Sequence, residues 1–235
     1  MTTSSPTALV TGASRGIGRA IALRLAPRWS VVALARTAPE LETLAVEIRG
    51  NGGMCEALPL DVTDGRAVRD ALEKRAIDVV INNAGVGVMK PFVELDLSEW
   101  QLMMDVNLNA VYHVTHAVLP GMIERRSGHV CTIGSISGRG AFVGGSCYAA
   151  TKAFVTSWSE SLMLEVREHG VKVSVVMPGS VASHFNDHVP SDEDAWKLRP
   201  EDVAETVAHV IATPPQVLVH RAEVRTLNVP KGRAR

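Results

Sequence analysis

The sequence has no apolar run near the roughly 20 residues that a membrane-spanning helix needs. Residues 1–10 have neither the basic start nor the length of a secretory signal. The formal net charge is -1, and basic residues form no stripe apart from the short tail 231–235, so nothing predicts a nucleic-acid surface. We therefore expect a cytoplasmic protein that neither enters membranes nor binds nucleic acid.

Cysteine is also scarce. The three cysteines are Cys55, Cys131 and Cys147. An odd number without CxxC spacing disfavours both a disulfide framework and a zinc site. The pairs His113/His116 and His184/His188 have spacings that suit one helical face, but neither pair has an acidic or cysteine partner at metal-site spacing. We expect reduced thiols and no metal site.

Short apolar runs alternate along the chain with longer segments of helical period. The predicted strands are 8–10, 31–34, 56–60, 79–81, 129–133 and 171–176, and the predicted helices are about 16–28, 40–50, 64–75, 98–124 and 148–169. Parallel neighbours need a crossover connection, so this alternation predicts a doubly wound α/β fold, a parallel sheet with helices on both faces. No repeat, low-complexity stretch or Pro/Gly-rich linker interrupts the pattern, and we expect one domain over 1–235.

A glycine-rich turn, Thr-Gly-Ala-Ser-Arg-Gly-Ile-Gly at 11–18, joins the first predicted strand to the first predicted helix. Backbone amides and the positive end of the helix dipole can receive a pyrophosphate at such a junction. Gly12 permits the tight turn, Gly16 lets phosphates approach the backbone, and Gly18 lets the helix pack close to the sheet. The pattern predicts a Rossmann-type dinucleotide site.

The second predicted strand ends at Arg36, where an NAD-binding protein usually carries an Asp or Glu for the ribose 2′-hydroxyl. Arg15 lies inside the glycine turn. Two guanidinium groups can hold a 2′-phosphate by charge-assisted bidentate hydrogen bonds, which predicts NADP(H). The alternative is that both arginines are surface charges.

Tyr148 and Lys152 are four residues apart, a spacing that places both side chains on one helical face. A nearby ammonium favours phenolate and lowers the tyrosine pKa from roughly 10 toward the working range. Ser135 lies thirteen residues before Tyr148. On its own, the YxxxK pattern also fits a buried ring beside a solvated lysine.

Five motifs occur in a fixed order. They are TGxxxGxG at 11–18, Asp61-Val62, Asn-Asn-Ala-Gly at 82–85, Ser135 with Tyr148 and Lys152, and Pro178-Gly179. Together they closely resemble the short-chain dehydrogenase/reductase family in its compact single-domain branch, over about residues 7–213. The resemblance implies an NADP(H)-dependent oxidoreductase that reduces a ketone or aldehyde to an alcohol, or catalyses the reverse reaction.

The resemblance also implies residue roles. Tyr148 would donate a proton to the carbonyl oxygen, Ser135 would hydrogen-bond that oxygen, and Lys152 would hold the nicotinamide ribose and lower the Tyr148 pKa. Asn107 would bind a proton-relay water. The implied cofactor contacts are Gly12, Ser14, Arg15, Gly16, Ile17, Gly18, Arg36, Asp61, Val62, Asn83, Ala84, Gly85, Tyr148, Lys152, Pro178, Gly179, Val181 and Ser183. For Asp61, expected to accept from the adenine amino group, the alternative is a helix N-cap before Thr63-Asp64.

Three segments are expected to face the substrate. The expected substrate-facing segments are 86–90, 137–145 and a mobile lid at 182–198, with apolar Ala141, Phe142, Val143 and Phe185 but also cationic Lys90, Arg139, His184 and His188. Among functions, a 3-oxoacyl thioester reductase and a non-catalytic NADP(H)-sensing protein are the alternatives.

The resemblance implies a homodimer or homotetramer built on the helices at 98–124 and 148–169. Val111, Val114, Val118 and Phe154 would serve that contact or the monomer core. Residues 216–227 are predicted to be an extended or twice-paired strand, in place of the glycine-rich finish of many relatives, and 230–235 a flexible tail.

Overall fold

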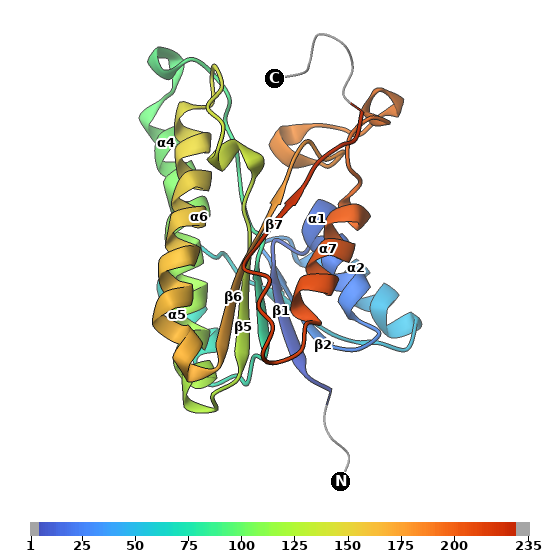
Figure 1. Ribbon diagram of the computed structural model, residues 1–235. Helices are drawn as coiled ribbons and strands as arrows, with labels where there is room; N and C mark the ends of the chain where they lie inside the picture. Colours follow the sequence, from blue (N-terminus) through green and yellow to red (C-terminus); the bar gives the residue numbers. More distant parts are fainter. Residues whose placement is uncertain (1–4, 229–235) are drawn as a thin grey trace.

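A seven-stranded sheet runs through the centre of the molecule (Figure 1). The computed structural model describes residues 5–228, so the predicted tail at 230–235 lies outside the described residues. The strands are β1 (Thr7–Thr11), β2 (Ser30–Ala35), β3 (Met54–Pro59), β4 (Val79–Asn82), β5 (Gly128–Ile133), β6 (Val171–Pro178) and β7 (Arg221–Val224). Their order is β3-β2-β1-β4-β5-β6-β7, and every neighbouring pair is parallel. The predicted doubly wound α/β fold is confirmed.

Helices cover both faces of this sheet (Figure 1). One layer holds α1 (Gly16–Leu25), α2 (Ala38–Gly50) and α7 (Pro200–Ile211), and the other holds α3 (Gly65–Leu72), α4 (Leu97–Met104), α5 (Ala110–Glu124) and α6 (Ser146–Val166). Each layer buries its own hydrophobic core against the sheet. Central strands are therefore apolar on both faces, which explains their near-continuous runs of Val, Ile, Leu and Ala.

The long predicted helix at 98–124 is divided. A π-helical turn at Asp105–Asn109 separates α4 from α5, with Asn107 buried inside it. Such turns widen a helix locally and often mark functional sites. The six predicted strands all form, with ends that differ from the prediction by at most two residues.

The C-terminal part differs most from the prediction. Within residues 216–227 only the short strand β7 forms, and among the described strands it pairs with β6 alone, so the twice-paired alternative is wrong. Helix α7 was not predicted, although Pro200 at its first turn and Asp202, whose carboxylate accepts from Arg199 N at 2.8 Å, are ordinary start signals.

The valines on α5 belong to the core. Val111, Val114 and Val118 are buried against the sheet, whereas Phe154 on α6 is 39% exposed. The structure thus assigns the three valines to the monomer and leaves Phe154 at the surface.

Candidate functional site

The glycine turn lies where the strand order reverses, between β1 and β4, at the carboxyl ends of both strands. Gly12 has φ +65°, and a Cβ built on it would lie 2.9 Å from the Cα of Ala84. A Cβ on Gly18 would collide with the carbonyl oxygen of Gly12. Both positions therefore require glycine, and the crevice at such a switch point is where α/β folds bind ligands.

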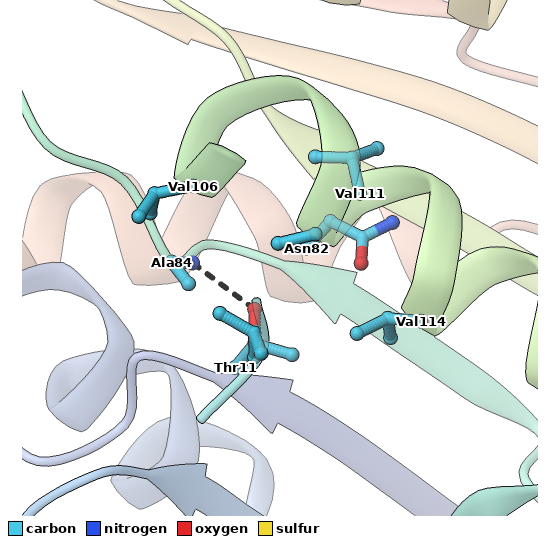
Figure 2. A pocket seen from close by; sticks show the side chains of 8 residues that line it. Thr11, Asn82, Ala84, Val106, Val111 and Val114 are labelled. Carbon is cyan, nitrogen blue, oxygen red and sulfur yellow. Dashed lines mark hydrogen bonds between the residues drawn. The ribbon is translucent and has the colours of Figure 1, made fainter. Parts of the chain in front are cut away.

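The turn at 82–85 is fixed to the glycine turn by Thr11. The Thr11 hydroxyl accepts from the backbone N–H groups of Asn83 and Ala84, each at 3.0 Å, and Figure 2 shows the bond to Ala84. The Asn83 side chain donates to Thr11 O at 2.9 Å. The two turns form one rigid unit, and Thr11, which the sequence analysis did not single out as a site residue, joins them.

A narrow, mostly apolar gap lies beside this unit. Val62, Ala84, Val106 and Val111 contribute to its lining, and Figure 2 shows the two α5-side valines Val111 and Val114 facing the turn. Val62 and Ala84, two of the expected cofactor contacts, therefore lie close to each other.

Asp61 forms the turn that precedes α3. Its Oδ1 accepts from Thr63 N at 2.9 Å and from Thr63 Oγ1 at 2.8 Å. The N-cap of α3 is Asp64, whose carboxylate accepts from Arg66 N and Ala67 N, so the N-cap alternative for Asp61 is wrong. The Thr63 hydrogen bonds and the charge of Arg36 lower the Asp61 pKa against the opposing effect of burial.

The Asn107 side chain joins three segments by hydrogen bonds. Its side-chain Oδ1 accepts from Val86 N at 2.9 Å, and its Nδ2 donates to Val86 O at 2.9 Å and to Thr151 Oγ1 at 3.0 Å. Thr151 in turn donates to Tyr148 O at 2.8 Å. The buried amide thereby fixes the segment after 82–85 against α6, and Thr151 is a site residue that sequence reasoning missed although it lies between Tyr148 and Lys152.

Ser135, Tyr148 and Lys152 gather at the carboxyl end of β5, and all three are buried. Ser135 Oγ accepts from Ser137 N at 3.1 Å, and the Lys152 Nζ donates to Ile133 O at 3.1 Å. Lys152 Nζ lies 5.9 Å from the centroid of the Tyr148 ring. These three predicted catalytic residues therefore share one place, and Lys152 Nζ lies 3.6 Å from a Cβ built on Gly85 in the turn at 82–85.

The electrostatics of this group differ from the expectation. Burial raises the pKa of the Tyr148 phenol, and a hydrogen bond with Ser135 opposes that rise. Burial lowers the pKa of Lys152 from 10.5 to about 8. In the protein alone, desolvation thus outweighs any help from Lys152, and Ser135 is the group that favours the phenolate.

The segment that follows β6 also lies next to the glycine turn. Gly179 N donates to Val224 O at 2.8 Å, and Val181 forms a bridge with Leu198. A Cβ on Gly16 would lie 3.5 Å from the Cβ of Ser183, which places Ser183 against the glycine turn. The ends of the segment 182–198 are held together, since Ala182 N donates to Leu198 O at 2.8 Å.

Within this segment, Asp194 is a buried carboxylate with several donors. His188 Nε2 and Lys197 Nζ each lie 2.5 Å from one of its oxygens, and Ser191 N donates at 3.2 Å. Lys197 first and His188 second hold the Asp194 pKa well below its usual range. These contacts tie Asp194 to three other residues of the same segment.

The cysteines have no reactive thiolate. Burial raises the pKa of Cys131 to about 12 and also raises that of Cys147, so both remain thiols. Within the described part of the chain, no group of three or more His, Cys, Asp or Glu could hold a metal ion. No helix formed by residues 5–228 is long and apolar enough to cross a membrane.

A phosphate-bearing dinucleotide fits the residues present. The glycines leave backbone open at the N-terminus of α1, Arg15 and Arg36 are exposed on that side, and Lys152 and Ser183 lie further along the same edge.

Comparison with known proteins agrees with this geometry. The family model described as short chain dehydrogenase matches residues 6–194. Sulfoacetaldehyde reductase 2 of Chromohalobacter salexigens is 35% identical, with 92% of each chain covered. An NADP-dependent 3-hydroxy acid dehydrogenase of Salmonella typhi is 34% identical, with 92% of this chain and 93% of the relative covered.

Among solved structures, the closed form of a serine dehydrogenase complexed with NADP+ is similar, with a TM-score of 0.85 and 34% identity over 93% of this chain and 94% of that chain. These matches confirm the resemblance drawn from the five motifs.

Proposed function

Because the chain belongs to the short chain dehydrogenase family, we propose that it is an NADP(H)-dependent oxidoreductase that interconverts a ketone or aldehyde with an alcohol. The observation that carries this proposal is the gathering of Asn107, Ser135, Tyr148 and Lys152 at the sheet edge that also bears the glycine turn. A binding protein has no use for a proton donor in that place.

NADP(H) is the proposed cofactor. The relatives include an NADP-dependent dehydrogenase and a structure complexed with NADP+, and this chain carries Arg15 and Arg36 where a 2′-phosphate would need cations. Preference over NAD(H) rests on those two guanidinium groups. When bound, the nicotinamide supplies or accepts the hydride.

The protein side chains handle the oxygen and its proton. Ser135 hydrogen-bonds the carbonyl oxygen, where negative charge grows during reduction. Tyr148 donates its phenolic proton to that oxygen, and the Ser135 bond makes this easier by favouring the phenolate. Lys152 binds the ribose hydroxyls of the cofactor, and Asn107 sets the position of Val86 and α6 around them.

The proposed substrate lid is 182–198, because it follows the cofactor segment and its Phe185 ring lies 5.6 Å from the Tyr148 ring. A homo-oligomer is also proposed, since Tyr112, Phe154 and Leu164 expose 55, 39 and 54% of their surface on α5 and α6.

The test is a panel of ketones, aldehydes, ketoesters and quinones, assayed with NADPH and NADH in parallel by the fall in cofactor absorbance. The proposal expects substrate-dependent oxidation that is faster with NADPH. Binding of NADPH without oxidation by any carbonyl on the panel would favour a sensing protein instead.

A further inference from the structure

Three segments converge on the substrate side of Tyr148. The Phe185 ring packs near the Tyr148 ring, and a Cβ on Gly87 would lie 2.6 Å from Phe185 Cζ and 3.1 Å from Met89 Cε. Gly144 lies against the backbone of Lys90, with 3.4 Å between its would-be Cβ and Lys90 N. The segments 86–100, 137–145 and 182–198 therefore surround one entrance, which we call the mouth.

The inner wall of the mouth is apolar. Tyr148, Met103 and Cys147 form a buried cluster against which Val86, Val88, Leu95, Trp100, Phe142 and Phe185 pack. Each of the three segments also leaves apolar side chains exposed. They are Met89 at 39%, Phe92 at 65%, Val93 at 91% and Leu97 at 70% in the first segment, Val143 at 89% in the second and Val189 at 74% in the third. A substrate next to Tyr148 is thus met mainly by hydrocarbon and aromatic surface, which favours an apolar body.

The charge of the mouth is acidic although the whole chain is almost neutral. Its three segments contain only Lys90, Arg139 and Lys197 as Lys or Arg residues. Among the side chains that the structure describes, their Asp and Glu residues are Glu94, Asp96, Glu99, Asp192, Glu193 and Asp194. The negative electrostatic potential of this entrance therefore repels an anionic substrate.

Lys90, Arg139 and Lys197, the Lys and Arg residues of the mouth, are already bound to carboxylates. Lys90 Nζ lies 2.7 Å from Glu99 Oε1, and Lys197 and His188 share Asp194. Arg139 pairs with Glu223 on β7, which also lies 3.3 Å from Arg225 Nε. Each of these three side chains would have to leave its partner before it could bind a substrate carboxylate.

We infer that the site selects uncharged carbonyl compounds with an apolar body, and that Glu99 and Glu223 exclude anionic substrates by occupying Lys90 and Arg139. This inference rests on the proposed function. It separates the chain from two relatives whose names specify acidic compounds, a sulfoacetaldehyde reductase and a 3-hydroxy acid dehydrogenase. A carboxylate placed against the apolar wall without a free cation loses hydration that nothing replaces.

Matched ketones test the selection with the full-length protein and NADPH. The neutral probe is methyl 4-acetylbenzoate, the anionic probe is 4-acetylbenzoate, and the cationic probe is 4-acetyl-N,N,N-trimethylanilinium. We expect kcat/KM for the neutral ester to exceed that for the carboxylate by about tenfold or more, a usual size for discrimination by one pocket contact. A higher kcat/KM for the carboxylate or for the cationic ketone would overturn the inference.

Two variants test the carboxylates. Glu99→Gln and Glu223→Gln each leave a cation at the mouth without its charged partner, and each should raise kcat/KM for 4-acetylbenzoate by about threefold or more. The ratio of kcat/KM for 4-acetylbenzoate to kcat/KM for the neutral ester should rise as well, which a general change in activity would not produce. Glu205→Gln is the matched control, because it removes the same charge from Arg24 between α1 and α7, in the other helix layer. Equal kcat/KM ratios in all three variants and the wild type would contradict the role of Glu99 and Glu223.

Failure of the proposed function looks different. In that case none of the three ketones is reduced by wild type or variants, while NADPH still binds. If a charged ketone is reduced with a higher kcat/KM than the neutral ester, the proposed oxidoreductase function still stands. Only the inferred substrate class is then overturned.

Discussion

Gly12 and Ala84 approach so closely that a Cβ on Gly12 would lie 2.9 Å from the Ala84 Cα. This contact joins the glycine turn after β1 to the turn after β4, and both belong to the proposed cofactor site. The space at Gly12 is therefore a functional requirement as well as a conformational one.

Gly12→Ala should weaken NADPH binding by at least about tenfold, because the added methyl pushes the two turns apart where phosphates approach the backbone. Fluorescence titration with NADPH measures the change. Gly52→Ala is the control, since Gly52 also has a positive φ, +82°, but nothing lies within 4 Å of its would-be Cβ. That variant should lose about 1 kcal/mol of stability and keep its affinity. Similar affinities in the two variants would show that crowding at Gly12 is unimportant.

Asn107→Ala should lower the free energy of unfolding by about 2–4 kcal/mol, because it removes three hydrogen bonds and leaves buried partners at Val86 and Thr151. Denaturant unfolding measures this loss. The control is Asn109→Ala on the same turn, where an exposed side chain donates only to Asp105 and the expected change is below about 0.5 kcal/mol. Equal losses of unfolding free energy in the two variants would mean that the Asn107 side chain does not hold these segments together.

Arg36→Ala should raise the Kd for NADPH by about tenfold or more and leave the Kd for NADH almost unchanged, because a charge-assisted bond to the 2′-phosphate is lost. Arg28→Ala removes an exposed arginine beyond the end of α1 and serves as the charge-matched control. If Arg36→Ala raises the Kd for NADPH and the Kd for NADH to the same extent, the guanidinium does not bind the 2′-phosphate.

The buried His129 predicts a sensitivity to acid. Its Nε2 lies 2.8 Å from Ser174 Oγ, which donates to Val219 O, and burial first, with the charge of Lys172 second, lowers its pKa from 6.5 to about 3. Between pH 6.5 and pH 3 the native state binds fewer protons at this group than the unfolded chain does. Stability from His129 is therefore complete above pH 6.5 and falls on acidification, by up to about 1.4 kcal/mol per pH unit.

His129→Gln should reduce this slope in unfolding experiments between pH 6.5 and pH 4, because glutamine can still donate to Ser174 without gaining a proton. His169→Gln changes an exposed histidine and should retain the wild-type slope. Identical slopes in the two variants would mean that His129 does not titrate on unfolding.

Local patterns predicted most of the fold. The apolar runs identified six strands, and the glycines at 12, 16 and 18 identified the turn whose close contacts require them. Helical periodicity did not predict the π-helical turn at Asp105–Asn109, although the family resemblance implied a helix-kinking asparagine at Asn107. The side chain of Asn107 bonds Val86 and Thr151, which are distant in sequence and therefore leave no local pattern.

Contacts between residues that are distant in sequence also limited the prediction of the site. Arg139 and Glu223 are 84 positions apart, so the sequence showed a free cation at the mouth where the fold supplies a carboxylate. The pKa of Tyr148 also depends on burial, which the YxxxK spacing does not reveal.

The central claim is that Tyr148 is the proton donor of a carbonyl reduction, and Tyr148→Phe tests it most directly. The variant keeps the ring that packs near Phe185 and removes only the hydroxyl. With a ketone reduced by the wild type, kcat should fall by about 100-fold or more, while the Kd for NADPH measured by fluorescence stays within about twofold. A kcat close to that of the wild type, with NADPH bound equally well, would contradict the account.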